Sequence, residues 1–462
     1  MDKKLRLGII GFGNMGTSHA RNVNDGKCPD FVLTAIADIN PDRIAWGKEN
    51  LPAGITYFED ATAMLDSGMI DACIVAVPHY DHPRYATECM QRGIHVMVEK
   101  PAGVYTKQVR EMNEEAARHP EVKFGMMFNQ RTDHIYRKMR ELVQSGRFGE
   151  IRRVNWLITN WYRPQAYYDS GAWRATWAGE GGGVLLNQCP HNLDLWQWIC
   201  GMPVKIQSHL HYGKWHNIEV EDDVTTYVEY PNGATGVFIT TTGDAYGTNR
   251  FEIQLDKGKI VSDNGVLSVW EFEVAESEFT KINTVPFGGV PVHPVEIETD
   301  GKSEQHVGVL NAWADAILRG GNMIADGSEG INGLTLSNAM HLSSFLGKAV
   351  ELPLDEDLYY EELMKRVEAS QKKEEKEAVF ADTSNTYGGA KNIPEDITAT
   401  INMINTLKGT VSDATLLSQL DFIPDVNAEL EALEEQKKAN METFGLPLIN
   451  TSGSEEEETE EV

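Results

Sequence analysis

A glycine-rich turn near the start of the chain constrains the fold more than any other feature. The apolar run 5–10 leads into Gly11-Phe12-Gly13-Asn14-Met15-Gly16, and a second apolar run, 31–37, ends at Asp38. Glycines at this spacing let the backbone bend tightly and approach a pyrophosphate, which the free N–H groups of the following helix then bind. The order of strand, glycine turn, helix, strand and acid predicts a dinucleotide-binding domain.

The acid after the second run favours NAD over NADP. A carboxylate at Asp38 would accept hydrogen bonds from the ribose hydroxyls of the adenosine, and its charge would repel a 2′-phosphate. We therefore expect NAD as the cofactor, with NADP the less favoured choice. The residues expected to bind it here are Gly11, Phe12, Gly13, Asn14, Met15, Gly16 and Asp38.

Composition and charge narrow the class of partner. The chain has 462 residues, long enough for two or three domains, and a formal net charge of −29. That charge argues against nucleic acid and anionic membrane surfaces, because their phosphates attract Lys and Arg. Neither a signal peptide nor a membrane-spanning run is evident, and the five cysteines lack metal-ligand spacing. We expect a cytoplasmic protein with no metal site and with buried, reduced thiols.

The hydrophobic pattern predicts three regions of α/β character. Residues 1–128 alternate apolar strands with helices, as the parallel sheet of a Rossmann domain requires. Residues 129–350 carry longer strands of alternating polarity and a hairpin turn at 231–233, which predict an α/β domain with a mostly antiparallel sheet open on one face. Residues 351–462 predict a helical extension with a disordered acidic end, since 17 acids face 4 bases from residue 381 onward.

One stretch of that extension resembles a different kind of protein. Residues 413–425, followed by 429–440, resemble the helical C-terminus of some phage portal proteins. The alternative, which we favour, is an appended helix that serves assembly or is simply solvated.

Two further segments carry polar residues suited to proton transfer. Glu99-Lys100-Pro101 ends an apolar strand, at the sheet edge where ligands bind, and a lysine whose pKa is lowered by burial can accept or donate a proton. Glycines 181–183 are expected to open a helix, and if it is continuous, His191 lies one turn beyond Asn187 on the same face. The alternatives are a surface salt bridge for Lys100 and a structural role for His191.

A third segment is aromatic and basic. It contains Tyr162 and Arg163, and further on Trp173 and Arg174. Rings and guanidinium groups suit a polar ligand with apolar faces, such as a sugar ring. A packed aromatic loop is the alternative.

Four motifs together resemble one known family. In order they are 11–16, Val75-Ala-Val-Pro78, Glu99-Lys-Pro101, and 181–183 leading to His191-Asn-Leu-Asp194. This arrangement is similar to the glucose-fructose oxidoreductase / inositol dehydrogenase / MocA-like (Gfo/Idh/MocA) family, over residues 1 to about 370. The resemblance implies NAD(P)-dependent oxidation or reduction of a sugar, inositol or related alcohol. It also implies a second domain whose open sheet often supports a homo-oligomer.

The resemblance implies roles for individual residues. Lys100 and His191 would contact the reacting hydroxyl as catalytic residues, and Asn187, Trp173 and Arg174 would lie near the substrate, with Tyr162 and Arg163 expected to join them. The residues expected around the nicotinamide are Val77, Pro78, His79, His82, Glu99 and Lys100.

Asn187 departs from the family pattern. Many members have Asp at this position, four residues before the histidine. Loss of that carboxylate should lower the pKa of Lys100 and favour its neutral form. Proton transfer would then fall to Lys100, His191 or both.

Three functions are consistent with these residues. The leading one is transfer of a hydride between NAD and a ring hydroxyl of a sugar, glycoside or inositol. The second is a redox-neutral eliminating or glycoside-cleaving enzyme with tightly bound NAD, which net NADH release would distinguish from the first. The third is a non-catalytic NAD-sensing regulator, against which the presence of both Lys100 and His191 counts.

Overall fold

The computed structural model describes residues 4–370. They fall within one compact unit, residues 1–376. Most of the predicted helical extension, its acidic end and the portal-like stretch lie outside the described residues. None of the helices in the described part of the chain is both long and apolar enough to cross a membrane.

The first sheet is a six-stranded parallel sheet with the strand order β3-β2-β1-β4-β5-β6. Its strands are β1 (Leu5–Ile10), β2 (Phe31–Ala37), β3 (Thr56–Phe58), β4 (Ala72–Val75), β5 (His95–Val98) and β6 (Phe124–Met126). The connecting helices are α1 (Asn14–Asn24), α2 (Pro41–Asn50), α3 (Ala61–Asp66), α4 (His82–Gln91) and α5 (Thr106–Arg118). Strand β4 is buried at every position, as expected where helices cover both faces. The predicted Rossmann sheet is confirmed.

The second sheet has nine strands in the order β14-β13-β12-β11-β7-β10-β9-β8-β15. They are β7 (Ile151–Ile158), β8 (Lys205–Tyr212), β9 (Glu221–Glu229), β10 (Thr235–Thr241), β11 (Asn249–Leu255), β12 (Gly258–Asp263), β13 (Val266–Phe272), β14 (Val292–Val295) and β15 (Val350–Glu351). Only β7 and β10 pair in parallel. The mostly antiparallel sheet is therefore confirmed, and the 231–233 turn joins β9 to β10 as predicted.

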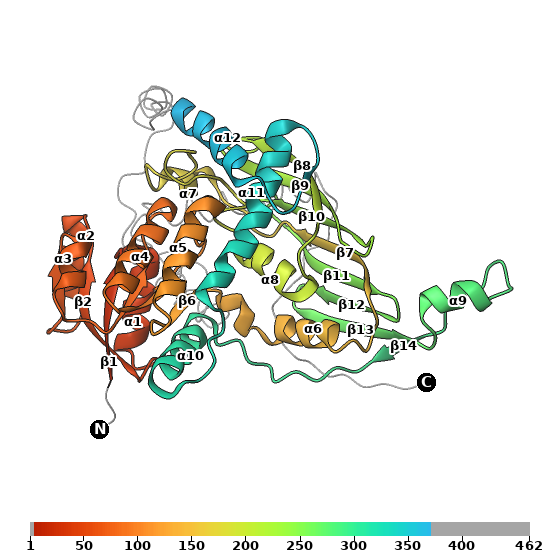
Figure 1. The fold of residues 1–462 in the computed structure, drawn as a ribbon, viewed down its shortest axis with the longest axis horizontal. Coiled ribbons are helices and arrows are strands. Elements are labelled where there is room, and N and C mark those ends of the chain that lie inside the picture. Colours follow the sequence, from red (N-terminus) through yellow and green to blue (C-terminus); the bar gives the residue numbers. More distant parts are fainter. Residues whose placement is uncertain (1–3, 371–462) are drawn as a thin grey trace, which may run out of the picture. The chain divides into compact units, whose positions relative to one another are not determined.

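Within residues 4–370, helices cover one face of the second sheet and leave the other open. These helices include α6 (His134–Gln144), α8 (Pro190–Cys200) and α11 (Gly330–Leu346) (Figure 1). On the covered face, the Trp196 ring of α8 lies 5.4 Å from that of Phe238 on β10. On the open face, Leu157 and Tyr227 remain 36% and 42% exposed. Alternation along the strands predicts this division, because neighbouring side chains point to opposite faces.

Helix α10 (Gln305–Arg319) follows the second sheet in the chain but packs against the first. Its Leu310 and Trp313 are buried in one cluster with Leu5 and Phe31, and the Trp313 indole N–H donates to the Lys123 carbonyl at 3.0 Å. The Rossmann core is therefore completed by a segment about 180 residues beyond its last strand.

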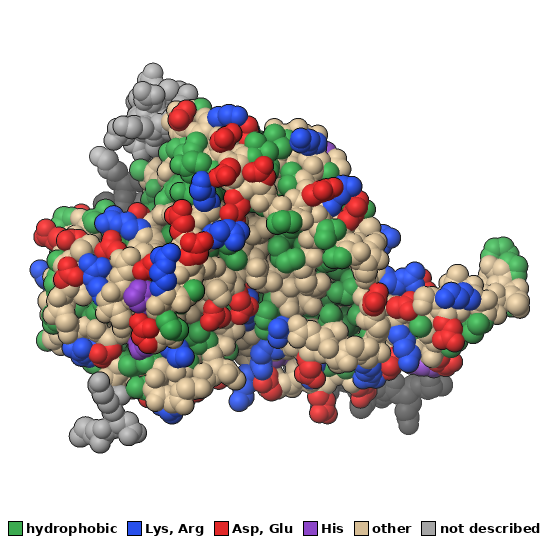
Figure 2. Space-filling view, in the orientation of Figure 1, with side chains coloured by type: hydrophobic (Ala, Val, Ile, Leu, Met, Phe, Trp, Pro, Cys, Tyr) green, Lys and Arg blue, Asp and Glu red, His purple; other side chains and the backbone are tan. Residues whose placement is uncertain are grey.

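Two features lie away from these cores. The segment with α9 (Glu276–Ile282) extends beyond the edge of the second sheet near β14 (Figure 1), and α9 has no buried residue. Acidic and basic side chains are interspersed over the face shown in Figure 2. That mixture is typical of a solvated surface rather than a nucleic-acid interface.

Candidate active site

The glycine turn has the geometry that a bound pyrophosphate requires. Gly11 has a φ of 88°, and a Cβ there would overlap the Ala76 carbonyl oxygen. A Cβ at Gly16 would overlap the Gly11 carbonyl, whereas Gly13 faces open space. The N-cap residue of α1 is Gly13, which has no side chain to cap the helix, and the first turn of α1 has no acid. Its N–H groups are therefore available to an anion, and the residues present fit a dinucleotide.

Asp38 lies at this turn and holds it. Its Oδ2 accepts the Phe12 N–H at 2.6 Å, and its Oδ1 accepts the Asn40 N–H at 2.8 Å. Arg43 of α2 donates to the Phe12 carbonyl at 2.8 Å from the other side. Each carboxylate oxygen keeps a second acceptor position, so the contacts leave Asp38 able to accept ribose hydroxyls.

Lys100 connects the Rossmann sheet to the segment that precedes α8. Its Nζ donates to the Asn187 backbone carbonyl at 2.8 Å. Burial lowers the pKa of Lys100, while the negative charges of Glu99 and Glu180 oppose that change. The amine is thus partly desolvated at the carboxyl edge of the sheet, in the environment expected of a proton-transferring lysine.

Glu99 has a buried protein partner. Its Oε1 lies 2.7 Å from His19 Nε2, and both side chains are almost fully buried. Burial alone would raise the pKa of Glu99, but the hydrogen bond and charge of His19, together with the charges of His306 and Lys100, lower the pKa to about 2. The pair joins α1, which follows the glycine turn, to the bend that carries Lys100.

A buried carboxyl at Glu180 is the main site feature that sequence reasoning missed. It accepts a hydrogen bond from the Asn187 side-chain amide and, at 2.7 Å, the Ala175 N–H. Arg174 lies 3.9 Å away. Burial raises the pKa of Glu180, and these hydrogen bonds and the Arg174 charge oppose the rise. The only available signal was an acid directly before the glycines, in a run otherwise free of charge.

Glu180 corrects the expectation drawn from Asn187. Many family members have a carboxylate at the position of Asn187. Here Glu180, seven residues earlier, supplies a carboxylate instead, and its negative charge raises the pKa of Lys100. The lowered pKa of Lys100 therefore results from burial, not from the loss of a neighbouring acid.

The expected helix through Asn187 is also wrong. Helix α8 begins at Pro190, and Asn187 lies in the turns before it. Pro190 takes a first-turn position, where its missing N–H costs nothing. Asn187 is held by its backbone N–H, which donates to the Gly183 carbonyl at 2.9 Å, and by its side chain, whose Oδ1 accepts the Tyr167 hydroxyl at 3.2 Å.

His191 lies in the first turn of α8 and is 9% exposed. Burial, together with the Lys100 charge, lowers its pKa to about 3. Its Nδ1 has no hydrogen-bond partner within residues 4–370. A neutral imidazole with a free nitrogen can hold a substrate hydroxyl, but it is a weaker proton acceptor than a neutral amine.

Two histidines that follow β4, His79 and His82, make hydrogen-bond contacts with backbone carbonyls of neighbouring loops. The two ring nitrogens of His82 lie 2.7 Å from the Pro101 carbonyl and 2.8 Å from the Val77 carbonyl. His79 Nδ1 lies 3.1 Å from the Glu180 carbonyl. Burial lowers the pKa of both histidines. These contacts position the segment that contains the exposed Pro78.

The aromatic segment divides into inner and outer parts. Arg174 donates to the Tyr167 hydroxyl at 2.9 Å and stacks on the Trp173 ring at 4.6 Å, which places both predicted residues in the Glu180 network. Tyr162 is 45% exposed and lies outside that network. Arg163 stacks on the Tyr167 ring at 5.2 Å and donates to the Tyr162 carbonyl.

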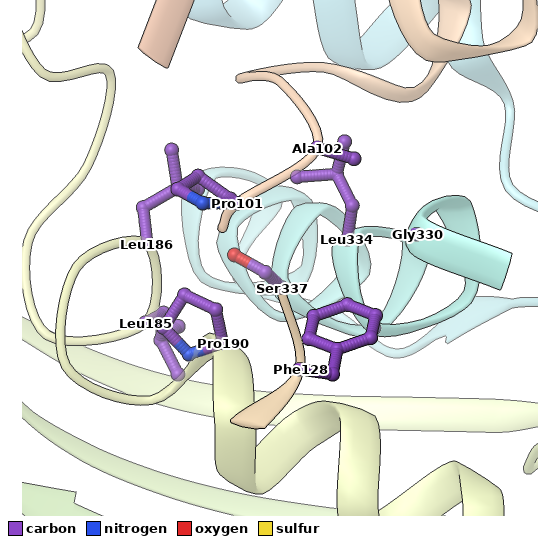
Figure 3. A pocket seen from close by; sticks show the side chains of 10 residues that line it. Pro101, Ala102, Phe128, Leu185, Leu186, Pro190, Gly330, Leu334 and Ser337 are labelled. Atoms are coloured by element: carbon purple, nitrogen blue, oxygen red, sulfur yellow. The ribbon is translucent and has the colours of Figure 1, made fainter. Parts of the chain in front are cut away.

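An apolar cavity lies behind the Lys100–Pro101 bend. Figure 3 shows its lining, in which Pro101, Leu186 and Leu334 come from three separate segments and the Ser337 hydroxyl is the one polar side-chain group drawn. A lining of this kind has no group for proton transfer, so we assign the cavity no part in the chemistry. Residues 4–370 also contain no cluster of His, Cys, Asp or Glu arranged to hold a metal ion.

Comparison with known families decides the class. A model of the oxidoreductase family with an NAD-binding Rossmann fold matches residues 5–126, and a model of the GFO/IDH/MocA C-terminal domain matches residues 136–261. The chain belongs to the Gfo/Idh/MocA family. The predicted membership, the NAD cofactor and the oxidoreductase class are therefore confirmed.

Several Gfo/Idh/MocA proteins are similar to this chain at moderate sequence identity. Myo-inositol 2-dehydrogenase of Thermotoga maritima is 27% identical over 56% of this chain and 75% of its own length. The rhizopine catabolism protein MocA of Rhizobium meliloti is 26% identical over 43% of this chain and 58% of its own. The WlbA dehydrogenase of Chromobacterium violaceum, solved with NADH and UDP-GlcNAcA, superposes with a TM-score of 0.66 at 28% identity, covering 77% of this chain and 98% of that one.

A second family matches after the Gfo/Idh/MocA part. A model of the SPP1 Gp6-like phage portal protein matches residues 366–443. The portal-like resemblance predicted for 413–440 thus extends over a longer stretch, nearly all of it outside the described residues. Whether it serves assembly stays untested.

Proposed function

We propose that the protein oxidises a ring hydroxyl of a sugar, glycoside or inositol with NAD, and that Lys100 accepts the hydroxyl proton. The observation that carries this proposal is the Lys100 amine, held at 2.8 Å by the Asn187 carbonyl, with its pKa lowered by burial. The names of the relatives support the substrate class, since they include an inositol dehydrogenase and a dehydrogenase crystallised with a sugar nucleotide.

The neutral lysine amine has one lone pair and two N–H groups. One N–H stays on the Asn187 carbonyl, which aims the lone pair, and the substrate hydroxyl gives its proton to that lone pair. His191 holds the same hydroxyl through its neutral ring and keeps it oriented. The chemistry that bound NAD would supply is a hydride acceptor for the carbon that carries the hydroxyl. In reverse, the protonated Lys100 returns its proton to the oxygen.

The test is a panel of sugars, inositols and glycosides with NAD, followed by NADH absorbance. Lys100→Ala should lower kcat by about 10² to 10⁴ while NAD binding persists, because general acid–base catalysis contributes that much. Near-normal turnover of this variant would show that another group takes the proton. Substrate conversion without net NADH would favour a redox-neutral cycle instead.

We propose further that two copies associate through the open face of the second sheet. Ile239 lies directly opposite Leu157, and Val237 opposite Tyr227. These four form a partly exposed apolar strip on that face, as typical of protein interfaces. Leu157→Lys should lower the mass in solution, measured by light scattering on the full chain, whereas the same mass as the wild type would contradict this interface.

Residues 1–128 are proposed as the NAD domain and 129–350 as the substrate domain, with 351–462 as an extension. The cytoplasm is the proposed location. The five cysteines support it, because all are buried and unpaired, as expected in a reducing compartment. Expression of a tagged full-length chain followed by fractionation tests the location.

A further inference from the structure

A polar cleft is lined by Asn192, the residue after His191. Its volume is about 240 Å³, just below the roughly 300 to 1,000 Å³ of sites that take a whole drug-sized molecule. It lies where β7 ends and where β11, α8 and α10 begin. We call it the amide pocket after its main lining residues, which are Gln130, Asn160, Trp161, Asn192, Asn249 and Gln305.

The pocket contains a buried amide with unused hydrogen-bonding capacity. Asn192 follows His191 and is 1% exposed. Its Oδ1 accepts the Trp161 indole N–H at 3.2 Å, which fixes the amide orientation. Its Nδ2 has no partner within residues 4–370. Buried polar groups are nearly always paired, so this N–H₂ group calls for an acceptor from a ligand.

The walls of the pocket are held in place before any ligand arrives. Asn249 Oδ1 accepts the Trp156 indole N–H at 2.9 Å. Gln305 has a φ of 53°, and its N–H donates to Thr132 Oγ1 at 2.7 Å. Such strained backbone at a non-glycine residue clusters at ligand sites, where the surrounding contacts maintain it.

The charge of the lining excludes a phosphate. Its only charged side chain is Asp133, whose oxygens accept the Ile135 N–H and the Ser303 hydroxyl. Phosphates are bound by arginine, lysine or clustered N–H groups. Carboxamides instead both donate and accept, as sugar hydroxyls do. Arg163 is not a lining residue, and its guanidinium lies 5.8 Å from the centre of the Trp161 ring.

We propose that the amide pocket binds an uncharged sugar unit attached to the ring that is oxidised. The substrate is then a neutral glycoside or disaccharide and not a sugar nucleotide. The Trp161 ring covers the apolar face of that second unit, and Asn192 Nδ2 donates to one of its oxygens. This inference rests on the proposed function, since it assumes that the first ring lies at Lys100 and His191.

Binding is measured by calorimetry on the full chain saturated with NADH, so that no oxidation occurs. The probes are glucose, the neutral disaccharides cellobiose, maltose and trehalose, and UDP-glucose. At least one disaccharide should bind 10-fold or more tightly than glucose, and UDP-glucose should show no such gain. Asn192→Ala should weaken that disaccharide about 10-fold and weaken glucose less.

Gln130→Ala provides a second variant, because Gln130 lines the pocket and is not among the buried residues of its turn, so its loss should leave the fold intact. It should also weaken the disaccharide selectively, whereas Gln207→Ala on the open sheet should not. The inference would be overturned if UDP-glucose bound most tightly, or if glucose and all the disaccharides bound equally. It would also be overturned if both variants lost as much affinity for glucose as for the disaccharide.

These outcomes separate the pocket from the chemistry. Selective disaccharide binding without NADH formation from NAD would contradict the proposed function and leave the pocket assignment standing. NADH formation from monosaccharides with no disaccharide preference would do the reverse.

Discussion

The amine of Lys100 and the carboxyl of Glu180 occupy one small buried volume, joined through Asn187. The Asn187 backbone carbonyl holds the amine, and its side-chain amide donates to the carboxyl. A negative charge here stabilises the protonated lysine, and burial of the amine destabilises it. The balance between these two effects sets the pH at which Lys100 becomes a base.

Replacing Glu180 by Gln tests that balance. The variant keeps the shape and removes the charge, so the pKa of Lys100 should fall. Because the reaction needs neutral Lys100, the rise of kcat/KM with pH should move to lower pH. The high-pH plateau of kcat/KM should fall about 10-fold, because the single amide oxygen cannot replace both carboxylate oxygens that accept from Asn187 and Ala175. The pH profile of sugar oxidation measures both effects. Glu252→Gln on the open sheet should leave the profile in place.

Exchanging the two groups provides a stricter test at the same positions. Asn187→Asp alone puts two carboxyls together, whose repulsion should lower kcat/KM by about 10-fold or more. The double variant Asn187→Asp with Glu180→Gln restores one acid and one amide and should recover most of that loss, as a coupled pair requires. Additive losses would show that the two side chains act independently.

At the scale of elements, one buried ion pair fastens α8 beside the Rossmann sheet. Arg131, in the 3₁₀ turn 129–132 after β6, makes two hydrogen bonds to Asp194 at 2.7 and 2.6 Å. Its second partner is Glu329, which accepts a third hydrogen bond at 2.7 Å. Both Arg131 and Asp194 side chains are 1% exposed. Since Asp194 is one turn beyond His191, this contact sets where His191 stands relative to Lys100.

Asp194→Ala should therefore lower the free energy of unfolding by about 3 to 5 kcal/mol, because it leaves a buried guanidinium with one partner. Urea denaturation followed by tryptophan fluorescence measures the loss. Glu271→Ala, which breaks the exposed pair with Arg147, should cost less than about 1 kcal/mol. Similar losses in both variants would mean that burial of the pair contributes nothing.

At the scale of the whole molecule, several buried histidines are kept neutral. Burial lowers the pKa of His79, His82 and His306, and that of His191 to about 3. An unfolded histidine takes up a proton near pH 6.5, whereas these do so only at lower pH. Their contribution to stability is thus complete above pH 6.5 and is lost as the pH falls toward the lowered values.

Acidification from pH 7.5 to 5 should destabilise the fold by about 2 kcal/mol through His191 alone. Urea midpoints across this range measure the change. His191→Gln cannot titrate, so its stability should fall less steeply with pH than that of the wild type. If the stability of the two proteins fell equally with pH, groups other than His191 would cause the acid sensitivity.

The local pattern of the sequence determined the Rossmann half, the hairpin at 231–233 and the position of Lys100. Each depends on residues close together in the chain, where glycine spacing and alternating polarity directly reflect backbone geometry. The same pattern wrongly extended a helix through Asn187, because periodicity does not show that the helix begins only at Pro190.

Only the tertiary structure decided which distant residues share a site. It brought Glu180 to Lys100, His19 to Glu99, Arg131 to Asp194 and α10 into the Rossmann core, and it assembled the amide pocket from five separate segments. No periodic pattern or fixed residue spacing in the sequence signals these contacts. They depend on the burial of apolar surface across the whole chain, which selects one arrangement of elements and determines the charge around the reactive amine.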